Sequence, residues 1–174
     1  THCHSTTVTR ILVKANENNK KIEVFNTETR PLYQGRKTTR ELIGKNIKTT
    51  HLVDSAAHEF IKKSNIFLLG ADMITEEGEV ANKIGSNMFA EIACRHKVPL
   101  YICTNSWKFS KKDLKIEQRD SKEIWDQKSN YLTIENPAFE KINPKYIKGI
   151  ISELGVLSIR KFLKTVKKTY PWIK

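Results

Sequence analysis

The sequence has few cysteines and no long apolar run. Its three cysteines, Cys3, Cys94 and Cys103, are an odd number and lack the pair spacing of a metal site. A disulfide framework is therefore not expected, and a reducing compartment, the cytoplasm, is predicted. No apolar stretch is long enough to span a membrane, so a soluble protein without membrane contact is predicted.

Nucleotide-binding and nucleic-acid-binding motifs are also missing. The sequence contains neither the glycine-rich dinucleotide fingerprint nor a Walker A loop. It shows no aromatic stacking platform of the kind that binds single-stranded nucleic acid. The net charge of +12 would suit a polyanionic partner, but lysine supplies most of it. We therefore favour a solvated, lysine-rich surface over a nucleic-acid site.

Short apolar segments alternate with amphipathic ones over the first two thirds of the chain. The apolar segments are nearly continuous, as expected of parallel strands that are buried on both faces. They lie at 22–25, 49–53, 66–69 and 99–103, and helical patterns lie at 6–18, 36–45, 55–63 and 84–96. This alternation predicts an α/β fold of the Rossmann-like type, with a mostly parallel sheet flanked by helices.

The C-terminal third is less regular. Strands are predicted at 114–117, 131–134 and 148–152, and a closing helix at 159–168. We expect a single domain over residues 1–174, with residues 110–174 as its less regular C-terminal extension. The polar run at 1–7 suits a strand-to-helix turn capped by a serine or threonine, which leads us to expect a strand upstream.

Four polar segments follow the predicted strands, where an open parallel sheet is expected to bind its ligand. In the first, 1–6, Cys3 near a helix start is either an activated thiolate or an inert, weakly apolar residue. Metal binding by its His-Cys-His run is disfavoured, because adjacent side chains diverge. In the second, 27–36, Arg30 and Gln34 either bind a phosphate or carboxylate or belong to a capped loop.

The third and fourth polar segments add candidates for proton transfer and phosphate binding. Asp72 follows a buried strand and is either an acid or base or a loop-closing cap. Asn82 and Lys83 are predicted to open a helix, where they would hold a phosphate together with the helix N–H groups. Lys108 follows the strand at 99–103 and either points toward the same ligand or lies on the surface.

Seven segments, in order and spacing, resemble one known family. They are THCHS at 1–5, TETRPLYQGRK at 27–37, VDSAA at 53–57, GADMITEEGEVANKIGSN at 70–87, WKF at 107–109, NPAFEKINPKYI at 136–147 and SELGVL at 152–157. They are similar to the C-terminal Rossmann-like domain shared by ribose-1,5-bisphosphate isomerases, methylthioribose-1-phosphate isomerases and the regulatory subunits of translation initiation factor 2B. The C-terminal segments and the ending TYPWIK most resemble the archaeal ribose-1,5-bisphosphate isomerases.

The resemblance implies an aldose–ketose isomerase that needs no metal or nucleotide cofactor. Cys3 and Asp72 would be its acid and base, and the regulatory subunits tend to hold other residues there. This favours an enzyme acting on a phosphorylated pentose, most closely ribose 1,5-bisphosphate, over methylthioribose phosphate or a non-catalytic subunit that contacts translation initiation factor 2. The residues implied to bind phosphate or hydroxyl groups are Gln34, Asn82, Lys83, Lys108 and, as the weakest candidate, Arg30.

The resemblance also implies a homo-oligomer and an N-terminal helical domain that these residues do not include. In the family that domain supplies an Arg-Gly segment for the substrate phosphate, so residues 1–174 alone are expected to be inactive. The sequence departs from the family at 142–144, in place of a Thr-Pro-Pro-like run, and at 158–159, in place of a proline pair. Both departures fall in the C-terminal extension, where they affect the expected subunit contacts rather than the chemistry.

Overall fold

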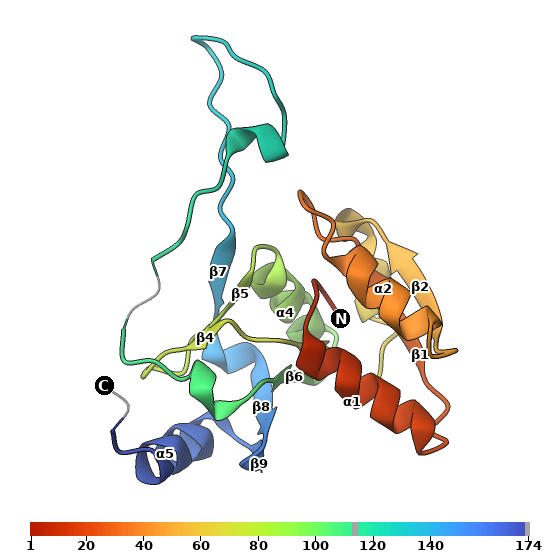
Figure 1. Cartoon of the computed structure of the whole chain (residues 1–174), viewed down its shortest axis with the longest axis vertical. Coiled ribbons are helices and arrows are strands. Elements are labelled where there is room, and N and C mark those ends of the chain that lie inside the picture. Colours follow the sequence, from red (N-terminus) through yellow and green to blue (C-terminus); the bar gives the residue numbers. More distant parts are fainter. Residues whose placement is uncertain (113–114, 173–174) are drawn as a thin grey trace.

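A computed structural model of the chain describes residues 1–112 and 115–172 and shows a mixed α/β fold (Figure 1). Its parallel strands are flanked by helices, as predicted. The first sheet pairs β1 (Glu23–Thr27) with β2 (Lys48–Leu52) in parallel. All residues of β2 are exposed or half-buried, which suits the polar sequence of a strand at the edge of the sheet.

The second sheet is the centre of the molecule. Three strands run parallel in it: β3 (Phe67–Leu69), β6 (Leu100–Cys103) and β8 (Ile147–Ser152). A short strand, β9 (Gly155–Leu157), returns antiparallel beside β8. All three residues of β3 are buried, because helices cover both of its faces.

A third, antiparallel sheet was not predicted from the sequence. It consists of β4 (Met73–Ile74), β5 (Val80–Lys83) and β7 (Phe139–Ile142). A turn at 75–78 joins β4 to β5, where Gly78 has a φ of 83° that favours glycine. The end of β5 therefore holds residues 82–83, for which a helix start was wrongly predicted.

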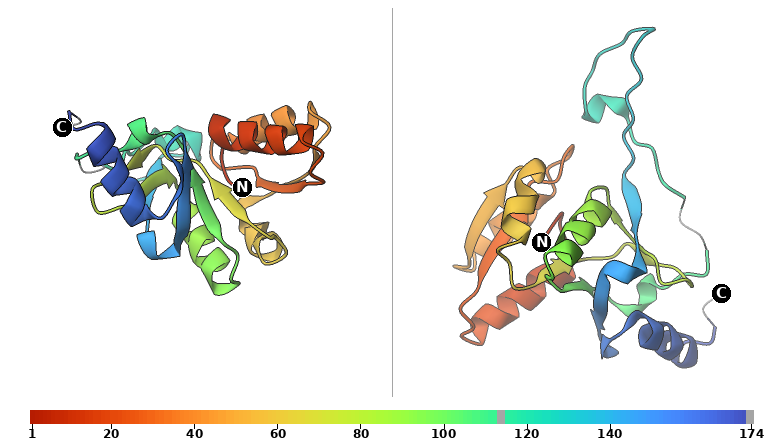
Figure 2. Two further views of the ribbon diagram at one scale, coloured as in Figure 1. Left: turned by 90° about the horizontal axis from the view of Figure 1, so that it is seen from below. Right: turned by 180° about the vertical axis from the view of Figure 1, so that it is seen from behind.

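Helices cover both faces of the parallel strands (Figure 2, left). The helices α1 (Thr6–Glu17) and α2 (Gly35–Ile43) lie on one face, and α3 (Ala57–Ile61) and α4 (Ser86–Arg95) lie on the other. A last helix, α5 (Ile159–Thr169), packs on β8 and β9. In the described ranges, none of the helices has the length and apolar character that crossing a membrane requires.

The apolar core lies between the central sheet, α4 and α5. Its fully buried side chains include Phe89 of α4, Ile102 of β6 and Phe162 of α5. The helix at 159–169 confirms the predicted closing helix, and its Ser158 accepts a hydrogen bond from the Lys161 N–H as an N-cap. This core fixes the ends of β3 and β6, which carry the candidate site.

A long arm, residues 115–138, projects away from the core (Figures 1 and 2). Its base is closed by a backbone hydrogen bond of 2.9 Å from the Arg119 N–H to the Asn136 carbonyl. The predicted strand at 131–134 is absent, because this segment has no neighbouring strand to pair with. The predicted strand at 114–117 begins outside the described residues, and 115–117 form no strand.

Candidate active site

A cavity of about 280 Å³ opens where β3 and β6 end and α1 begins. It lies at the carboxyl ends of parallel strands, as predicted for the ligand site. Its walls come from four segments that are far apart in the sequence. They are His4, Ser5, Thr6 and Thr7; Gly70, Ala71 and Asp72; Asn82; and Cys103, Thr104, Asn105 and Lys108.

The start of α1 forms one wall of this cavity. Ser5 is the N-cap and accepts a hydrogen bond from the Val8 N–H, while the first turn holds no acidic residue. The N–H groups of Thr6 and Thr7 therefore remain available to an anion. Gly70 allows this wall to meet the end of β3, since a Cβ atom there would lie 2.7 Å from the Ser5 Oγ.

Asp72 and Lys108 both line this cavity, and their opposite charges interact. Asp72 is fixed through its backbone, whose N–H donates to the Ala81 carbonyl at 2.9 Å. Loss of surrounding water raises the pKa of its carboxyl, while Lys108 and Lys83 act in the opposite direction. A carboxyl with a raised pKa at a strand end fits the predicted role in proton transfer.

A glutamate from the β8–β9 turn holds the loop that carries Lys108. Glu153 accepts hydrogen bonds from the Ser106 N–H, at 3.0 Å, and from the Ser106 hydroxyl. Ser106 is fully buried and begins the single 3₁₀ turn that ends at Lys108. The position of the Lys108 ammonium thus depends on a residue 45 positions later in the sequence.

Asn82 and Lys83 are buried side by side at the end of β5, with 5% and 4% of their surfaces exposed. The Asn82 Nδ2 has no hydrogen-bond partner, although it lines the cavity. Among the residues that the structure describes, the Lys83 ammonium also has no hydrogen-bonding or ion-pair partner. Burying an unpaired ammonium costs free energy, so this pair is suited to receive an anionic ligand.

The start of α4 does not contribute to phosphate binding as the sequence suggested. The carboxylate of Glu140, on β7, accepts a hydrogen bond of 2.8 Å from the Asn87 N–H and also interacts with the N–H groups of Gly85 and Ser86. The helix begins only after Gly85, whose φ of 96° places it in the left-handed region. A carboxylate therefore already occupies this helix start.

Cys3 lies two residues before the cap of α1 rather than in its first turn. The sequence suggested a thiolate stabilised by the helix, but burial raises the pKa of the Cys3 thiol above its usual value. Lys83 lowers that pKa, and Asp72 and Asp54 raise it further, so these groups lie within electrostatic reach of the thiol. Cys3 is thus held as a thiol within electrostatic reach of Asp72 and Lys83, although it is not among the residues that line the cavity.

The other two cysteines differ from each other. Cys103 is buried at the end of β6, and burial raises the pKa of its thiol to about 12. Cys94, in contrast, is exposed on α4. A reagent for thiols therefore meets Cys94 first.

Gln34 and Arg30 lie on the loop between β1 and α2. Gln34 is half-buried, and its Oε1 atom is buried without a partner in the described part of the chain. The Arg30 side chain is exposed, and its guanidinium lies over the Tyr33 ring, 5.2 Å from the ring centroid. The cavity is lined by neither of them.

Residues that sequence reasoning did not single out complete the site. Asp54, Glu140 and Glu153 lie in the segments VDSAA, NPAFE and SELGVL, but they act by accepting hydrogen bonds from other segments. Thr104 and Asn105 line the cavity directly. The one signal in the sequence was an acidic residue inside each of those three segments, and it does not indicate which backbone group each carboxylate meets.

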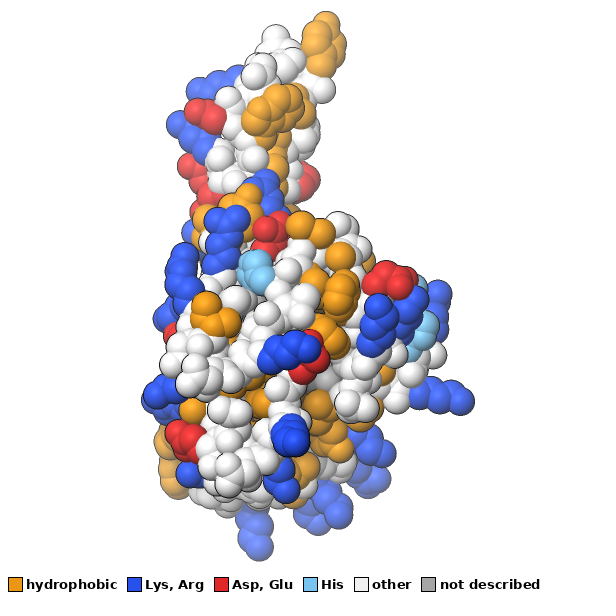
Figure 3. All heavy atoms as spheres, turned by 90° about the vertical axis from the view of Figure 1, so that its right-hand side faces the viewer, with side chains coloured by type: hydrophobic (Ala, Val, Ile, Leu, Met, Phe, Trp, Pro, Cys, Tyr) orange, Lys and Arg blue, Asp and Glu red, His pale blue; other side chains and the backbone are white. Residues whose placement is uncertain are grey.

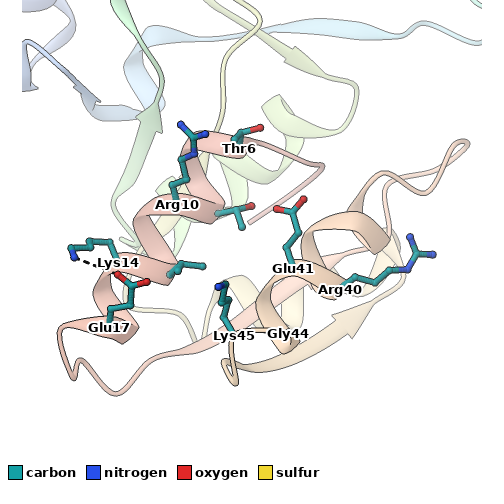
Figure 4. A pocket seen from close by; sticks show the side chains of 10 residues that line it. Thr6, Arg10, Lys14, Glu17, Arg40, Glu41, Gly44 and Lys45 are labelled. Carbon is teal, nitrogen blue, oxygen red and sulfur yellow. Dashed lines mark hydrogen bonds and ion pairs between the residues drawn. The ribbon is translucent and has the colours of Figure 1, made fainter.

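A second hollow, of about 630 Å³, lies between α1 and α2 (Figure 4). Basic and acidic side chains project from its rims, and Lys14 pairs there with Glu17 at 3.3 Å. Of the described side chains that line it, none holds a buried polar atom without a partner. It therefore lacks the feature that marks the cavity at the strand ends.

Comparison with known proteins shows similarity over most of the chain. The model of the "Initiation factor 2 subunit family" matches residues 1–159. The ribose 1,5-bisphosphate isomerase of Methanocaldococcus jannaschii is 36% identical, over 100% of this chain and 59% of the relative. Two solved structures are similar in fold: a 5-methylthioribose 1-phosphate isomerase from Pyrococcus horikoshii, and the translation initiation factor eIF-2B subunit delta from A. fulgidus.

The two structures match with TM-scores of 0.87 and 0.83 and sequence identities of 26% and 28%, respectively. The alignments cover 97% and 94% of this chain but only 53% and 55% of the solved chains. The chain thus spans little more than half the length of the proteins it matches.

Proposed function

Since the chain belongs to the initiation factor 2 subunit family, we propose that the protein is a sugar-phosphate isomerase that converts an aldose into a ketose. The relatives named as isomerases act on ribose 1,5-bisphosphate or methylthioribose 1-phosphate. We further propose ribose 1,5-bisphosphate as the substrate and ribulose 1,5-bisphosphate as the product. The single observation that carries this proposal is the buried Lys83, without a partner in the described chain, beside the unpartnered Asn82 amide.

The reaction needs two groups that exchange protons with the sugar. A phosphate on C1 blocks ordinary ring opening, so the ring oxygen must receive a proton as its bond to C1 breaks. C2 gives up its proton to a base, which leaves an enol between C1 and C2. C1 is then protonated while the hydroxyl group on C2 loses its proton and becomes the ketone. Cys3 and Asp72 are the proposed pair, because they lie within electrostatic reach of each other and of the buried Lys83.

The character of the cavity favours a second phosphate over a methylthio group. Among its described lining residues, no aliphatic side chain is larger than that of Ala71. This lining instead offers hydrogen-bond donors, which are the free N–H groups of Thr6 and Thr7 and the ammonium of Lys108. Such donors suit a phosphate rather than an apolar group. A bisphosphate would satisfy both this wall and the Asn82–Lys83 pair.

The test is turnover of both sugars by the whole protein and by its Asp72→Asn variant. Asparagine keeps the size of the side chain but cannot exchange a proton, so turnover should fall by roughly 10²–10⁴-fold with little change in affinity. Residues 1–174 alone should show no turnover. An Asp72→Asn variant as active as the wild type would exclude the proposed mechanism.

A regulatory subunit is the second candidate function, because one solved structure of similar fold is a translation initiation factor subunit. Such a protein would bind a sugar phosphate without converting it. Calorimetry and turnover on one preparation separate the two functions. Binding of ribose 1,5-bisphosphate with no turnover by the whole wild-type protein would favour the regulator.

A further inference from the structure

Two residues, one just before α1 and one on the loop after β1, have an unusual backbone conformation. The φ angles of Cys3 and Thr29 are 64° and 65°, in the left-handed region that residues other than glycine rarely adopt. Such conformations cost free energy and persist only where surrounding contacts determine them. The contacts that hold Cys3 are therefore part of the design of the site.

Two threonine hydroxyls hold the peptide groups of Cys3. The Thr29 Oγ1 accepts a hydrogen bond of 2.9 Å from the Cys3 N–H, and the Thr38 hydroxyl donates one of 2.9 Å to the Cys3 carbonyl. Both threonines are buried, with 0% and 2% of their surfaces exposed. Cys3 is thus tied to side chains on two other segments, the loop after β1 and the helix α2.

Asp54 in turn holds the backbone around Thr29. Its Oδ1 accepts from the Thr29 N–H at 2.8 Å, and its Oδ2 accepts from the Arg30 N–H at 2.7 Å. Both carboxylate oxygens are therefore used on one loop. The chain of contacts runs from Asp54 at the end of β2, through Thr29, to the Cys3 peptide.

Thr38 is itself oriented by His4. The single hydroxyl proton of Thr38 goes to the Cys3 carbonyl, so the His4 Nδ1, at 3.1 Å, must donate to the Thr38 oxygen. This requires the proton of neutral His4 to be on Nδ1. The hydroxyl of Thr38 is thereby left with one orientation, toward Cys3.

We propose that Thr29, Thr38 and Asp54 are positioning residues that hold Cys3 in the left-handed conformation required for its proton transfer. Their hydrogen bonds are made to the Cys3 backbone and to the loop at Thr29, so they act through the position of Cys3, and neither they nor Cys3 itself line the cavity. The proposal rests on the proposed function, because it takes Cys3 to be one of the two proton-transfer groups. It adds residues to that function that touch neither the sugar nor its phosphates.

The test compares valine and serine at each threonine in the whole protein. Thr29→Val and Thr38→Val keep the shape of the side chain but remove the hydroxyl, while Thr29→Ser and Thr38→Ser keep it. We expect the valine variants to lose roughly 10- to 100-fold in kcat, with KM nearly unchanged, because a small displacement of a reacting group costs rate rather than binding. The serine variants should recover most of the loss. Valine variants with wild-type kcat would overturn the proposal.

A second readout uses the thiols and needs no turnover. Cys94 is exposed and serves as an internal reference, so the labelling of Cys3 relative to Cys94 reports the local state of Cys3 alone. Release of Cys3 from its buried position should raise this ratio by roughly ten-fold in the valine variants and leave it unchanged in the serine variants. An unchanged ratio in all four variants would overturn the proposed positioning of Cys3, whether or not the wild type turns over a sugar. Absence of turnover by the wild type would by itself contradict only the proposed function.

Discussion

At the scale of single residues, the burial of an unpaired ammonium distinguishes binding from structure. Replacing a structural lysine would lower the stability of the folded protein, whereas replacing a ligand-binding lysine should lower only the affinity for the ligand. Lys83 is buried and without a partner in the described chain, which suits the second role. Removing the charge should therefore lower the stability of the free protein if Lys83 is structural and raise it if Lys83 binds the ligand.

We predict that Lys83→Met weakens substrate binding and stabilises the free protein. Methionine retains the length of the side chain but carries no charge, so a charge-assisted contact of about 1.5–3 kcal/mol to a phosphate is lost. The free energy of unfolding without ligand should rise, since a buried unpaired charge has been removed. Isothermal calorimetry and urea denaturation measure the two effects. An unchanged KM together with reduced stability would assign Lys83 to the scaffold.

Histidine chemistry gives a second prediction at this scale. His2 is buried, its Nε2–H donates to the Ile84 carbonyl at 3.0 Å, and its Nδ1 accepts from the Thr27 hydroxyl at 2.6 Å. Burial lowers the pKa of His2 to about 4, below the usual value of 6.5. The neutral ring is therefore favoured in the folded protein, so its stabilising effect is complete above pH 6.5 and disappears as the pH falls toward 4.

The free energy of unfolding that is lost through His2 amounts to roughly 3 kcal/mol when the pH falls from above 6.5 to below 4. Urea denaturation between pH 7.5 and 4.5 should show it as a steeper acid loss of stability in the wild type than in His2→Gln. The carboxylates common to both proteins cancel in that comparison. Equal acid slopes would mean that His2 charges as easily in the folded protein as in the unfolded chain.

At the scale of elements, local pattern predicted most of the parallel strands and their helices but not the antiparallel sheet. The strands β3 and β6 are continuous apolar runs that indicate burial on both faces, whereas β8 also contains an exposed lysine, Lys148. The strand β5 contains Asn82 and Lys83, whose polar side chains suggested a helix start that binds phosphate. Its partner β7 lies about 60 residues later, and no local signal predicts such a pairing.

The candidate site was predictable to a similar degree. Asp72, Asn82 and Lys108 line the cavity as the sequence indicated, whereas the role of Glu140 depends on a contact between distant segments. The direction of the Cys3 pKa was also beyond the sequence, because it depends on how much water the folded chain removes. The roles assigned to these residues remain predictions.

Glu140 permits a prediction about α4. Glu140→Ala leaves the N–H groups at the helix start without their acceptor, which should cost about 1–2 kcal/mol of stability. Glu140→Gln retains an oxygen acceptor and avoids a carboxylate whose pKa burial raises, so it should cost much less. Thermal denaturation compares the pair. Ligand affinity should change less than stability, because the cap faces the helix and not the cavity.

At the scale of the whole molecule, the arm is nearly independent of the core. Its apolar side chains are exposed, Tyr131 entirely and Trp125 to 60%, and Figure 3 shows hydrophobic groups on its surface. Basic and acidic side chains are interspersed over the face seen there, rather than gathered in one stripe. The homo-oligomer implied by the family resemblance remains a proposal, and the arm offers a way to examine it.

We predict that replacing residues 120–135 by Asn-Gly leaves the core intact. The hydrogen bond between Arg119 and Asn136 already closes the base, and a two-residue turn suits it. The free energy of unfolding should change by less than about 1 kcal/mol, since the removed residues bury little surface. Denaturation measures this, and sedimentation of the same variant and the wild type shows whether the arm supports association. A collapse in stability would show that the arm is part of the core.

The unpaired Lys83 also makes the melting temperature of the protein a means of identifying its ligand. An anion that binds beside this ammonium stabilises only the folded state, by about 2.7 kcal/mol when its concentration is 100 times its dissociation constant. Phosphorylated sugars could thus be ranked in a dye-based melting screen before any product is assayed. The Lys83→Met variant, measured on the same plate, would separate compounds that use this charge from those that bind elsewhere.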